Sequence, residues 1–270
     1  TMSRLDATLL RQSIRPDSRQ RLEELEVFAG IDSTNTYLMQ MPGPPPGMFR
    51  VALADHQTAG RGRRNRDWVS PPESGLYLSF AYTFATYPRA LSALTLAIGM
   101  AVIDALAATG VKNVLLKWPN DLVFDNAKLG GILTEVQHEG GSAITVVAGV
   151  GLNIELPAGL DIGLDSEWAQ RATDLSHVSG SAPDIEALAV GVVDELASTC
   201  VEFECGGFER FADRWPSIDW LLGKDVVVDD EARSIEGMAA GVDKNGALLV
   251  QTETGERQRV ISGSIRLAKP

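Results

Sequence analysis

Three apolar segments follow one another closely in the middle of the chain, with short turns between them. They run from Val114 to Lys117, from Leu129 to Gln137 and from Ala143 to Ile154, and the turns fall at Pro119-Asn120-Asp121 and Glu139-Gly140-Gly141. Parallel strands need a crossover of a dozen or more residues, whereas antiparallel neighbours need only a tight turn. We therefore expect an antiparallel meander rather than strand–helix–strand crossovers.

Helical patterns surround this meander. The longest apolar stretch, Leu91 to Ala108, contains Ser92, Thr95, Gly99 and Asp104, which is typical of a buried central helix and not of a membrane span. Residues 14–26 form a polar, charged stretch to which we assign no regular element. Periodicity and capping residues predict further helices at 5–13, 37–41, 185–203 and 207–215, and strands at 51–54 and 76–82.

The pattern of the sequence changes after Leu222, from helical segments to short strands. Four short strand patterns with glycine turns follow, and Asp243-Lys244-Asn245-Gly246 is a strong hairpin signal. We expect strands at 225–228, 235–242, 247–252 and 258–260. The sequence thus predicts an α+β domain over residues 1–220 and a small β-barrel over residues 221–270.

The charge balance limits the partners of the chain. Its 270 residues carry 24 basic and 36 acidic side chains, for a net charge of −12. Non-specific affinity for nucleic acid comes from neutralising phosphates, so we do not expect a domain-wide nucleic-acid surface. Two cysteines and three histidines predict neither a disulfide framework nor a zinc site. The cysteine usage favours the cytoplasm, and without an apolar N-terminal segment we expect no signal peptide.

An arginine-rich loop stands out in this acidic chain. Four arginines lie within the segment Gly60-Arg61-Gly62-Arg63-Arg64-Asn65-Arg66. Glycines allow backbone N–H groups to approach an anion, and arginine suits bidentate contacts with phosphate or carboxylate. A solvated basic loop or a nucleic-acid patch would explain this segment equally well, so both interpretations remain open.

Two lysines flank the first turn of the predicted meander. Lys117-Trp118-Pro119-Asn120-Asp121 ends one strand, and Lys128-Leu129-Gly130-Gly131-Ile132-Leu133 opens another. Glycine within a strand often marks the close approach of a ligand or of another backbone. We expect both amines to point into one pocket, although an ordinary turn and a β-bulge would also account for these segments.

Two further segments carry weaker signals. Ser33-Thr34-Asn35 offers hydroxyl and amide groups, which helix capping alone would explain. Gly149-Val150-Gly151-Leu152-Asn153 is a glycine-containing strand that ends in an amide. The glycine pattern of the arginine-rich loop does not match a dinucleotide-binding fingerprint, and GxxxxGK[ST] is absent.

Taken in this order, the segments resemble the biotin protein ligases. The similarity rests on Ser33-Thr34-Asn35, on Gln57-Thr58-Ala59 with the arginine-rich loop, and on the two lysine segments. It runs from about Ile31 to Asn153 and continues more weakly to the C-terminus. The resemblance implies a class II synthetase-like catalytic domain, with a mixed and largely antiparallel sheet packed against helices, followed by a C-terminal SH3-like barrel.

The resemblance also implies a reaction in two steps. Biotin and MgATP would give biotinyl-5′-adenylate and pyrophosphate, and the biotinyl group would then pass to one lysine of a biotin carboxyl carrier domain. A carboxylate of pKa about 4 is already ionised at neutral pH, so the first step needs charge neutralisation rather than a general base. The implied substrates and cofactors are biotin, ATP and Mg²⁺.

The family motifs assign roles to residues of this chain. By resemblance, biotin would be bound by Ser33, Thr34, Asn35, Gln57, Arg61, Gly62, Arg63, Lys128 and Gly131. The nucleotide would be bound by Gly60, Arg61, Arg63, Arg66, Trp68, Lys117, Asn120 and Asn153. The expected catalytic residues are Lys128, bridging the biotin carboxylate and the α-phosphate, with Arg63, Lys117 and Asp121. The loop would close over the adenylate and exclude water.

Three of these roles have alternatives. Asp121 would orient or deprotonate the acceptor lysine, or else lie near Mg²⁺. Trp68 would stack on adenine or belong to the core. Arg266 would reach the phosphates, and the terminal barrel would close the ATP site or receive the carrier.

The sequence also departs from the family pattern and admits rival functions. Asn65 stands where glycine is frequent, and Asp67 where a basic residue is frequent.

Only 32 residues precede Ser33, too few for the winged helix-turn-helix of the regulatory members, so we expect no DNA-binding repressor role. The alternatives are a lipoate or octanoate ligase of the same fold and a nucleic-acid-binding module. A homodimer formed through the edge of the 143–154 strand is a further expectation.

Overall fold

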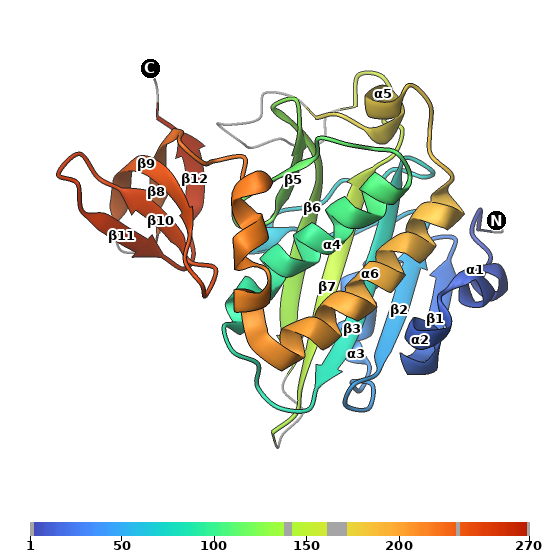
Figure 1. Ribbon diagram of the computed structural model, residues 1–270. Helices are drawn as coiled ribbons and strands as arrows, with labels where there is room; N and C mark the ends of the chain where they lie inside the picture. Colours follow the sequence, from blue (N-terminus) through green and yellow to red (C-terminus); the bar gives the residue numbers. More distant parts are fainter. Residues whose placement is uncertain (1–2, 138–141, 161–171, 231–232, 269–270) are drawn as a thin grey trace.

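A large sheet built from the first part of the chain carries the rest of the fold (Figure 1). The computed structural model describes residues 3–137, 142–160, 172–230 and 233–268. The sheet has seven strands in the order β1-β2-β3-β7-β6-β5-β4. Their bounds are β1 Leu22–Phe28, β2 Phe49–Ala54, β3 Gly75–Phe84, β4 Leu115–Lys117, β5 Asp121–Phe124, β6 Ala127–Gln137 and β7 Ile144–Asn153. Every pair is antiparallel except β1 with β2, which confirms the mixed, largely antiparallel sheet.

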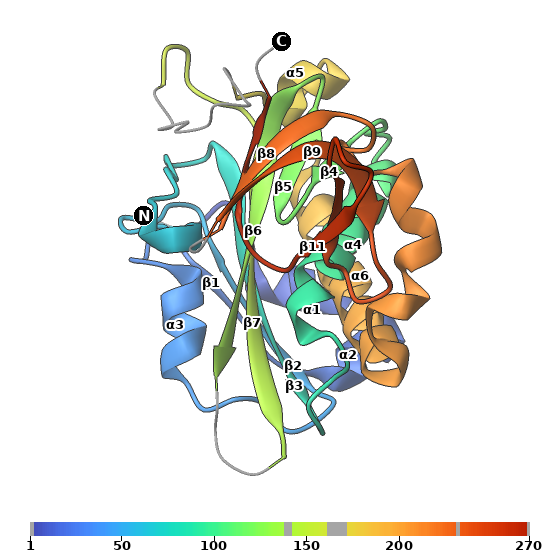
Figure 2. The ribbon, with the colours of Figure 1, turned by 90° about the vertical axis from the view of Figure 1, so that its left-hand side faces the viewer.

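Helices cover both faces of this sheet (Figure 2). α3 (Thr34–Gln40) packs on one face, and α4 (Leu94–Ala108) and α6 (Ile185–Gly206) pack on the other. Asp184 caps α6 by accepting from the backbone of Glu186 and Ala187. The remaining helices are α1 Ala7–Ser13, α2 Pro16–Arg21 and α5 Leu175–Ser179, with 3₁₀ turns at Arg63–Asn65, Leu91–Ala93, Gly207–Arg210 and Ala212–Ser217.

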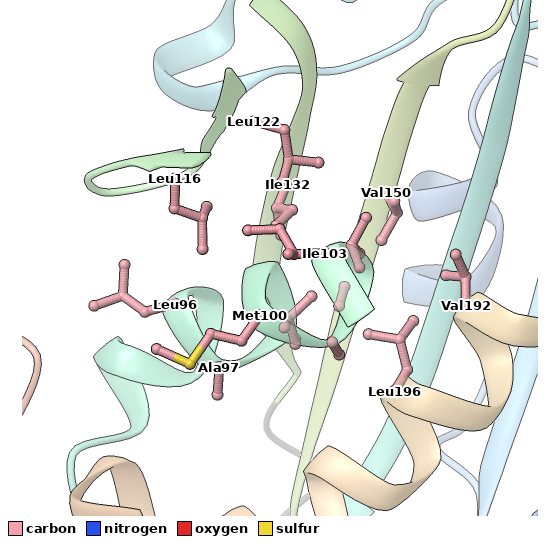
Figure 3. Close-up of a cluster of buried hydrophobic side chains, with 14 of the residues drawn as sticks. Leu96, Ala97, Met100, Ile103, Leu116, Leu122, Ile132, Val150, Val192 and Leu196 are labelled. Atoms are coloured by element: carbon pink, nitrogen blue, oxygen red, sulfur yellow. The ribbon is translucent and has the colours of Figure 1, made fainter. Parts of the chain in front are cut away.

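The main core lies between the sheet and the two long helices. Figure 3 shows Leu96 and Met100 of α4 below Leu116 of the sheet, with Val192 and Leu196 of α6 on the right of the picture. The segment 91–108 is long and apolar enough to cross a membrane by composition, but 72% of it is buried inside the protein. The sheet and α6 both pack against this helix, so the prediction of a central core helix is confirmed.

A second, five-stranded sheet follows α6 and packs beside the first (Figure 1). The tip of its β9–β10 hairpin rests on the larger sheet, where the Trp118 indole donates to the carbonyl of Gly246 at 3.1 Å. Gly246 has φ +77°, and a Cβ there would lie 2.3 Å from the Cβ of Ala93, so only glycine fits. The strands are β8 Asp225–Asp229, β9 Ser234–Val242, β10 Leu248–Gln251, β11 Arg257–Val260 and β12 Ser264–Leu267.

The structure corrects several sequence predictions. The polar stretch before Val27 is not irregular: it forms α2 and the edge strand β1, in which Glu23 is exposed while Glu24 and Glu26 are half-buried. Asp121 begins strand β5 instead of only closing a turn, and β12 was missed because it is short and half-polar. The helix predicted at 207–215 consists of 3₁₀ turns around Pro216, which cannot donate a helical hydrogen bond. The turn at 139–141 lies outside the described residues.

The predicted route to a homodimer is also wrong. The 143–154 strand corresponds to β7, which pairs with β3 on one side and with β6 on the other along its length. A strand that is hydrogen-bonded on both sides has no free edge to offer a second copy.

Candidate active site

A cavity opens on the face of the sheet that carries α3, and it holds about 430 Å³ of empty space, part of which is open to solvent. Its walls come from the start of α3, the loop between β2 and β3, and the strands β3, β6 and β7. Gly131 of β6 pairs in register with Gly151 of β7, and Gly149 lies opposite Leu133. The missing side chains leave the floor of the cavity open.

Neutral polar groups gather at one end of this cavity. Ser33 caps α3, which turns Thr34 and Asn35 toward the sheet. Gln57 Oε1 accepts from the Thr34 amide at 2.9 Å and from the Thr34 hydroxyl at 3.1 Å. The Ser79 hydroxyl lies 2.7 Å from Thr34 Oγ1 and 2.6 Å from Asn35 Oδ1. The structure therefore brings the predicted Thr34, Asn35 and Gln57 into one network, with Ser33 beside them as the cap of α3.

Two residues of this end were missed by sequence reasoning. Ser79 is a fully buried polar side chain within the apolar strand β3. Glu135 of β6 accepts from Asn35 Nδ2 at 3.0 Å and from both terminal nitrogens of Arg61, at 3.0 and 2.8 Å. Glu135 follows Gly131 at a spacing of four, which places it on the same face of β6, and this alternation was the available signal.

Charged groups gather beside the cavity, where β4, β5 and β6 meet, and we call this region the charged end of the site. Asp121 lies 2.8 Å from the Lys128 amine and 3.7 Å from the Lys117 amine, so the two lysines come together as predicted, although neither of them lines the cavity. Burial lowers the pKa of Lys117 to about 8, against the opposing attraction of Asp121. Although burial alone would raise the pKa of Asp121, the charges of Lys128 and Lys117 hold it below its usual range.

Arg63 joins this charged end from the arginine-rich loop. Its Nη1 donates to Asn120 Oδ1 at 3.3 Å, while Asn120 Nδ2 donates to the Ile132 carbonyl at 2.9 Å. Burial, followed by the neighbouring charge of Arg64, lowers the pKa of Arg63. A guanidinium remains charged at physiological pH, so the charged end carries three cations and one carboxylate.

Trp68 forms a wall between the two ends. A Cβ on Gly151 would lie within 2.6 to 2.9 Å of its indole, and the Lys128 amine lies 5.5 Å from the centre of the ring. The buried indole N–H has no hydrogen-bond acceptor within the part of the chain that the structure describes. Buried donors are normally paired, so an unpaired one in a cavity wall is consistent with a ligand site.

The remaining residues of the loop are distributed differently. Gly60 packs against the Trp68 carbonyl, and the Gly62 amide donates to the Arg66 carbonyl at 2.7 Å, which closes the loop. Arg64 contacts the hydroxyl of Ser264 in the small sheet. The pKa of Arg63 is lowered mainly by burial, and the charge of Arg66 lowers it further. Arg66 therefore lies near Arg63, toward the charged end.

Of the predicted nucleotide contacts, Arg61 and Trp68 line the cavity and the others lie outside its lining. Asn153 is buried, and its amide donates to the carbonyls of Lys128 at 3.4 Å and Thr173 at 3.0 Å. Arg266 lies on β12 with its guanidinium 3.5 Å from Asp229. Among the described residues, no group of three His, Cys, Asp or Glu side chains could hold a metal ion.

The arrangement suits two ligands that meet end to end. The neutral end offers fixed donors and acceptors to an uncharged polar group, and the charged end offers cations to a carboxylate and a phosphate. Three arginines of the loop contact protein groups, namely Glu135, Asn120 and Ser264.

Comparison with known proteins gives relatives with the same organisation. The profile of the Biotin/lipoate A/B protein ligase family matches residues 27–153, and that of the biotin protein ligase C terminal domain matches residues 221–267. The bifunctional ligase/repressor BirA of Escherichia coli is 33% identical over 84% of this chain and 69% of the relative. The biotin–[acetyl-CoA-carboxylase] ligase of Mycobacterium tuberculosis is 32% identical over 88% of this chain and 86% of the relative.

A solved structure shares the fold of both sheets. The biotin protein ligase of Aquifex aeolicus in complex with biotin and ATP superposes with a TM-score of 0.77 at 28% identity, covering 91% of this chain and 100% of the other. The profiles, the relatives and this structure agree with the motifs and with the two-sheet architecture. The chain therefore belongs to the biotin protein ligase family.

Proposed function

We propose that this chain activates biotin with ATP and transfers it to a lysine of a biotin carboxyl carrier domain. The observation that carries the proposal is the convergence of Lys117, Lys128 and Arg63 beside a cavity with a neutral polar end. Membership of the family makes the chain an ATP-dependent ligase. The geometry supplies the two subsites that such a reaction needs.

The first step joins two anions. A carboxylate oxygen of biotin attacks the α-phosphorus of ATP, a new C–O–P linkage forms, and pyrophosphate leaves with the electron pair of the broken P–O bond. Lys128, with Arg63 and Lys117, neutralises the charge that gathers around the α-phosphate, which is the main contribution a protein can make to such a transfer. Mg²⁺ would arrive on the ATP phosphates, because the described residues offer no carboxylate cluster to hold it.

The second step moves the biotinyl group to an amine. The carrier lysine attacks the carbonyl carbon of the adenylate, an amide forms, and AMP leaves. We assign Asp121 to holding Lys117 and Lys128 in place, because both its oxygens face ammonium groups and its lowered pKa makes it a poor base. An Asp121→Asn variant that transfers biotin from preformed adenylate at the normal rate would support this positioning role over proton abstraction.

Several residues extend the proposal. Ser33, Thr34, Asn35 and Gln57 would bind the ureido ring, and Gly131 would leave room for it. The closing loop would be formed by Gly60, Arg61, Gly62 and Arg66. Trp68 would stack on adenine, which would place the unpaired indole N–H near the polar groups of the nucleotide. Asn153 and Asn120 would hold the strand ends that present the two lysines.

The polar floor supports biotin over lipoate. Lipoate has an apolar dithiolane ring, whereas the cavity places Thr34, Asn35 and Ser79 where a cyclic urea would meet them. These groups are already hydrogen-bonded to one another, but they keep acceptor positions that the N–H groups of a cyclic urea can use and an apolar ring cannot. A nucleic-acid-binding function has less support, because the chain carries a net charge of −12 and non-specific affinity for nucleic acid depends on neutralising phosphates.

We also propose the cytoplasm as the compartment. The reaction consumes ATP, and Cys200 and Cys205 are both free thiols, which fits a reducing environment.

A direct test uses the full chain with biotin, MgATP and a carrier domain. We expect the mass of the carrier to increase by one biotinyl group, and radioactive pyrophosphate to exchange into ATP only when biotin is present. Exchange that depends on lipoate or octanoate instead of biotin would refute the assignment of the substrate.

A further inference from the structure

We infer that Glu135 determines the specificity of the cavity floor by fixing which way the amide of Asn35 points. The inference rests on the proposed function, since it concerns the recognition of the biotin ring. Glu135 does not line the cavity itself; it acts through Asn35 and Arg61, which do. It is therefore a positioning residue.

The first step of the argument is the polarity of Asn35. A carboxylate and a backbone carbonyl can only accept hydrogen bonds. Asn35 Nδ2 lies 3.0 Å from Glu135 and 3.4 Å from the carbonyl of Leu133, so the nitrogen must face both of them. The Asn35 oxygen then faces Ser79, at 2.6 Å, and Gly149.

The second step is what this orientation offers a ligand. Asn35 lines the cavity together with Ser79 and Gly149, and its carbonyl oxygen keeps a second lone pair besides the one that accepts from Ser79. A fixed acceptor at this place favours a ligand that brings an N–H group. It disfavours a ligand of the same shape with an oxygen at that position, because two acceptors would face each other.

The third step is the link to the loop. Glu135 has a half-buried side chain, and its charge is matched by both terminal nitrogens of Arg61. The same carboxylate thus contacts Asn35 at the floor of the cavity and Arg61 in the loop that covers the cavity. Arg61 anchors the loop, but it does not contact Asn35 in any described hydrogen bond, so the two effects of Glu135 can be separated.

The experiment measures binding of two ligands to the full chain by titration calorimetry, without ATP. The ligands are biotin and its cyclic carbamate analogue, in which one ring N–H is replaced by oxygen. Glu135→Gln replaces the carboxylate with an amide that can rotate together with the amide of Asn35, so we expect the preference for biotin over the carbamate to fall about tenfold. Glu135→Asp keeps an acceptor-only side chain and should retain the preference even if both ligands bind more weakly.

Two further variants separate the effects. Arg61→Gln should weaken both ligands by the same factor, because Glu135 still orients Asn35. Glu195→Gln removes the partner of a comparable ion pair, with Arg15 on a distant surface, and should change neither affinity nor preference. The thermal melting temperature of each variant shows whether it is folded.

The outcomes are distinct. An unchanged preference in a folded Glu135→Gln variant would overturn the inference while leaving biotin ligation intact. A loss of preference in Arg61→Gln equal to that in Glu135→Gln would show that the loop, and not the amide, determines specificity. A wild-type chain that produces no heat with biotin would overturn the proposed function itself.

Discussion

At each end of the site, a single carboxylate contacts two partner side chains. The two carboxylates differ in their partners and in their burial. At the neutral end, Glu135 holds an amide and an arginine at a partly exposed site. At the charged end, Asp121 holds Lys117 and Lys128 in a buried one. The neutral end recognises its ligand by the positions of donors and acceptors, whereas the charged end works by net charge. The two ends should therefore respond to different perturbations.

The largest effect is expected from removing a charge at the buried end. Lys128→Gln should lower the rate of biotin-dependent ATP–pyrophosphate exchange by about 10²- to 10³-fold, because a preorganised group that stabilises charge in the transition state is lost. Biotin binding without ATP should change much less. Lys112→Gln, at an exposed lysine in the loop before β4, is the matched control and should exchange normally. A similar loss in both variants would argue against the role of Lys128.

A steric change at the neutral end should weaken biotin binding and leave the use of ATP unchanged. Gly149→Ala places a Cβ 2.4 Å from Asn35 Oδ1, which displaces the amide and breaks its hydrogen bonds. A buried polar group left unpaired costs about 1–3 kcal/mol, so calorimetry should show biotin affinity lower by about 10- to 100-fold. The KM for ATP should remain as in the wild type. Gly191→Ala in α6, where a Cβ would meet only Ala105 at 3.7 Å, controls for glycine replacement.

The pH dependence of ATP use should distinguish the two ends. Because burial lowers the pKa of Lys117 to about 8, this amine loses its charge as the pH rises above that value. The KM for ATP should then increase between about pH 8 and pH 9, while biotin affinity stays level over the same range. Asp121→Asn removes the attraction that opposes the effect of burial, so the pKa of Lys117 falls further and the increase should begin at a lower pH. A wild-type KM for ATP that is constant across this range would contradict the assignment.

The smallest effect is expected where the second sheet supports the charged end. Trp118→Phe removes the hydrogen bond to the Gly246 carbonyl, at a cost of about 1 kcal/mol in the free energy of unfolding. Because Trp118 follows Lys117 directly, the KM for ATP should rise by a few fold and biotin affinity should not change. Trp215→Phe also removes a buried indole donor, to Asp219, and serves as the control. Equal changes in the KM for ATP in both variants would show a general loss of stability.

The sequence predicted one end of the site better than the other. Lysines in an acidic chain and arginines near glycines are conspicuous, and short turns brought Lys117, Asp121 and Lys128 together as expected. Ser79 and Glu135 carry ordinary residue types in ordinary strands, and their positions depend on how β3 and β6 lie relative to α3. Register across a sheet depends on pairing between distant segments, which a local pattern does not contain.

The same reasoning explains the errors in the fold. The long helix is a continuous apolar segment and the meander has short turns between apolar segments, so both were predicted. β1 is a charged edge strand that exists because β2 lies beside it in parallel, and β5 is only four residues long. Such strands are held by their neighbours more than by their own propensity.

The facing glycines of β6 and β7 have a practical consequence for redesign. Gly131 and Gly151 sit opposite each other beneath Trp68, and a methyl group on either would meet the indole, at 3.3 Å from Gly131 and at 2.6 Å from Gly151. An alanine at position 151 would therefore displace the tryptophan before it reached any bound molecule. Because the two glycines already carry the smallest side chain, an enzyme altered to accept bulkier vitamin analogues would have to gain its room by shrinking Trp68.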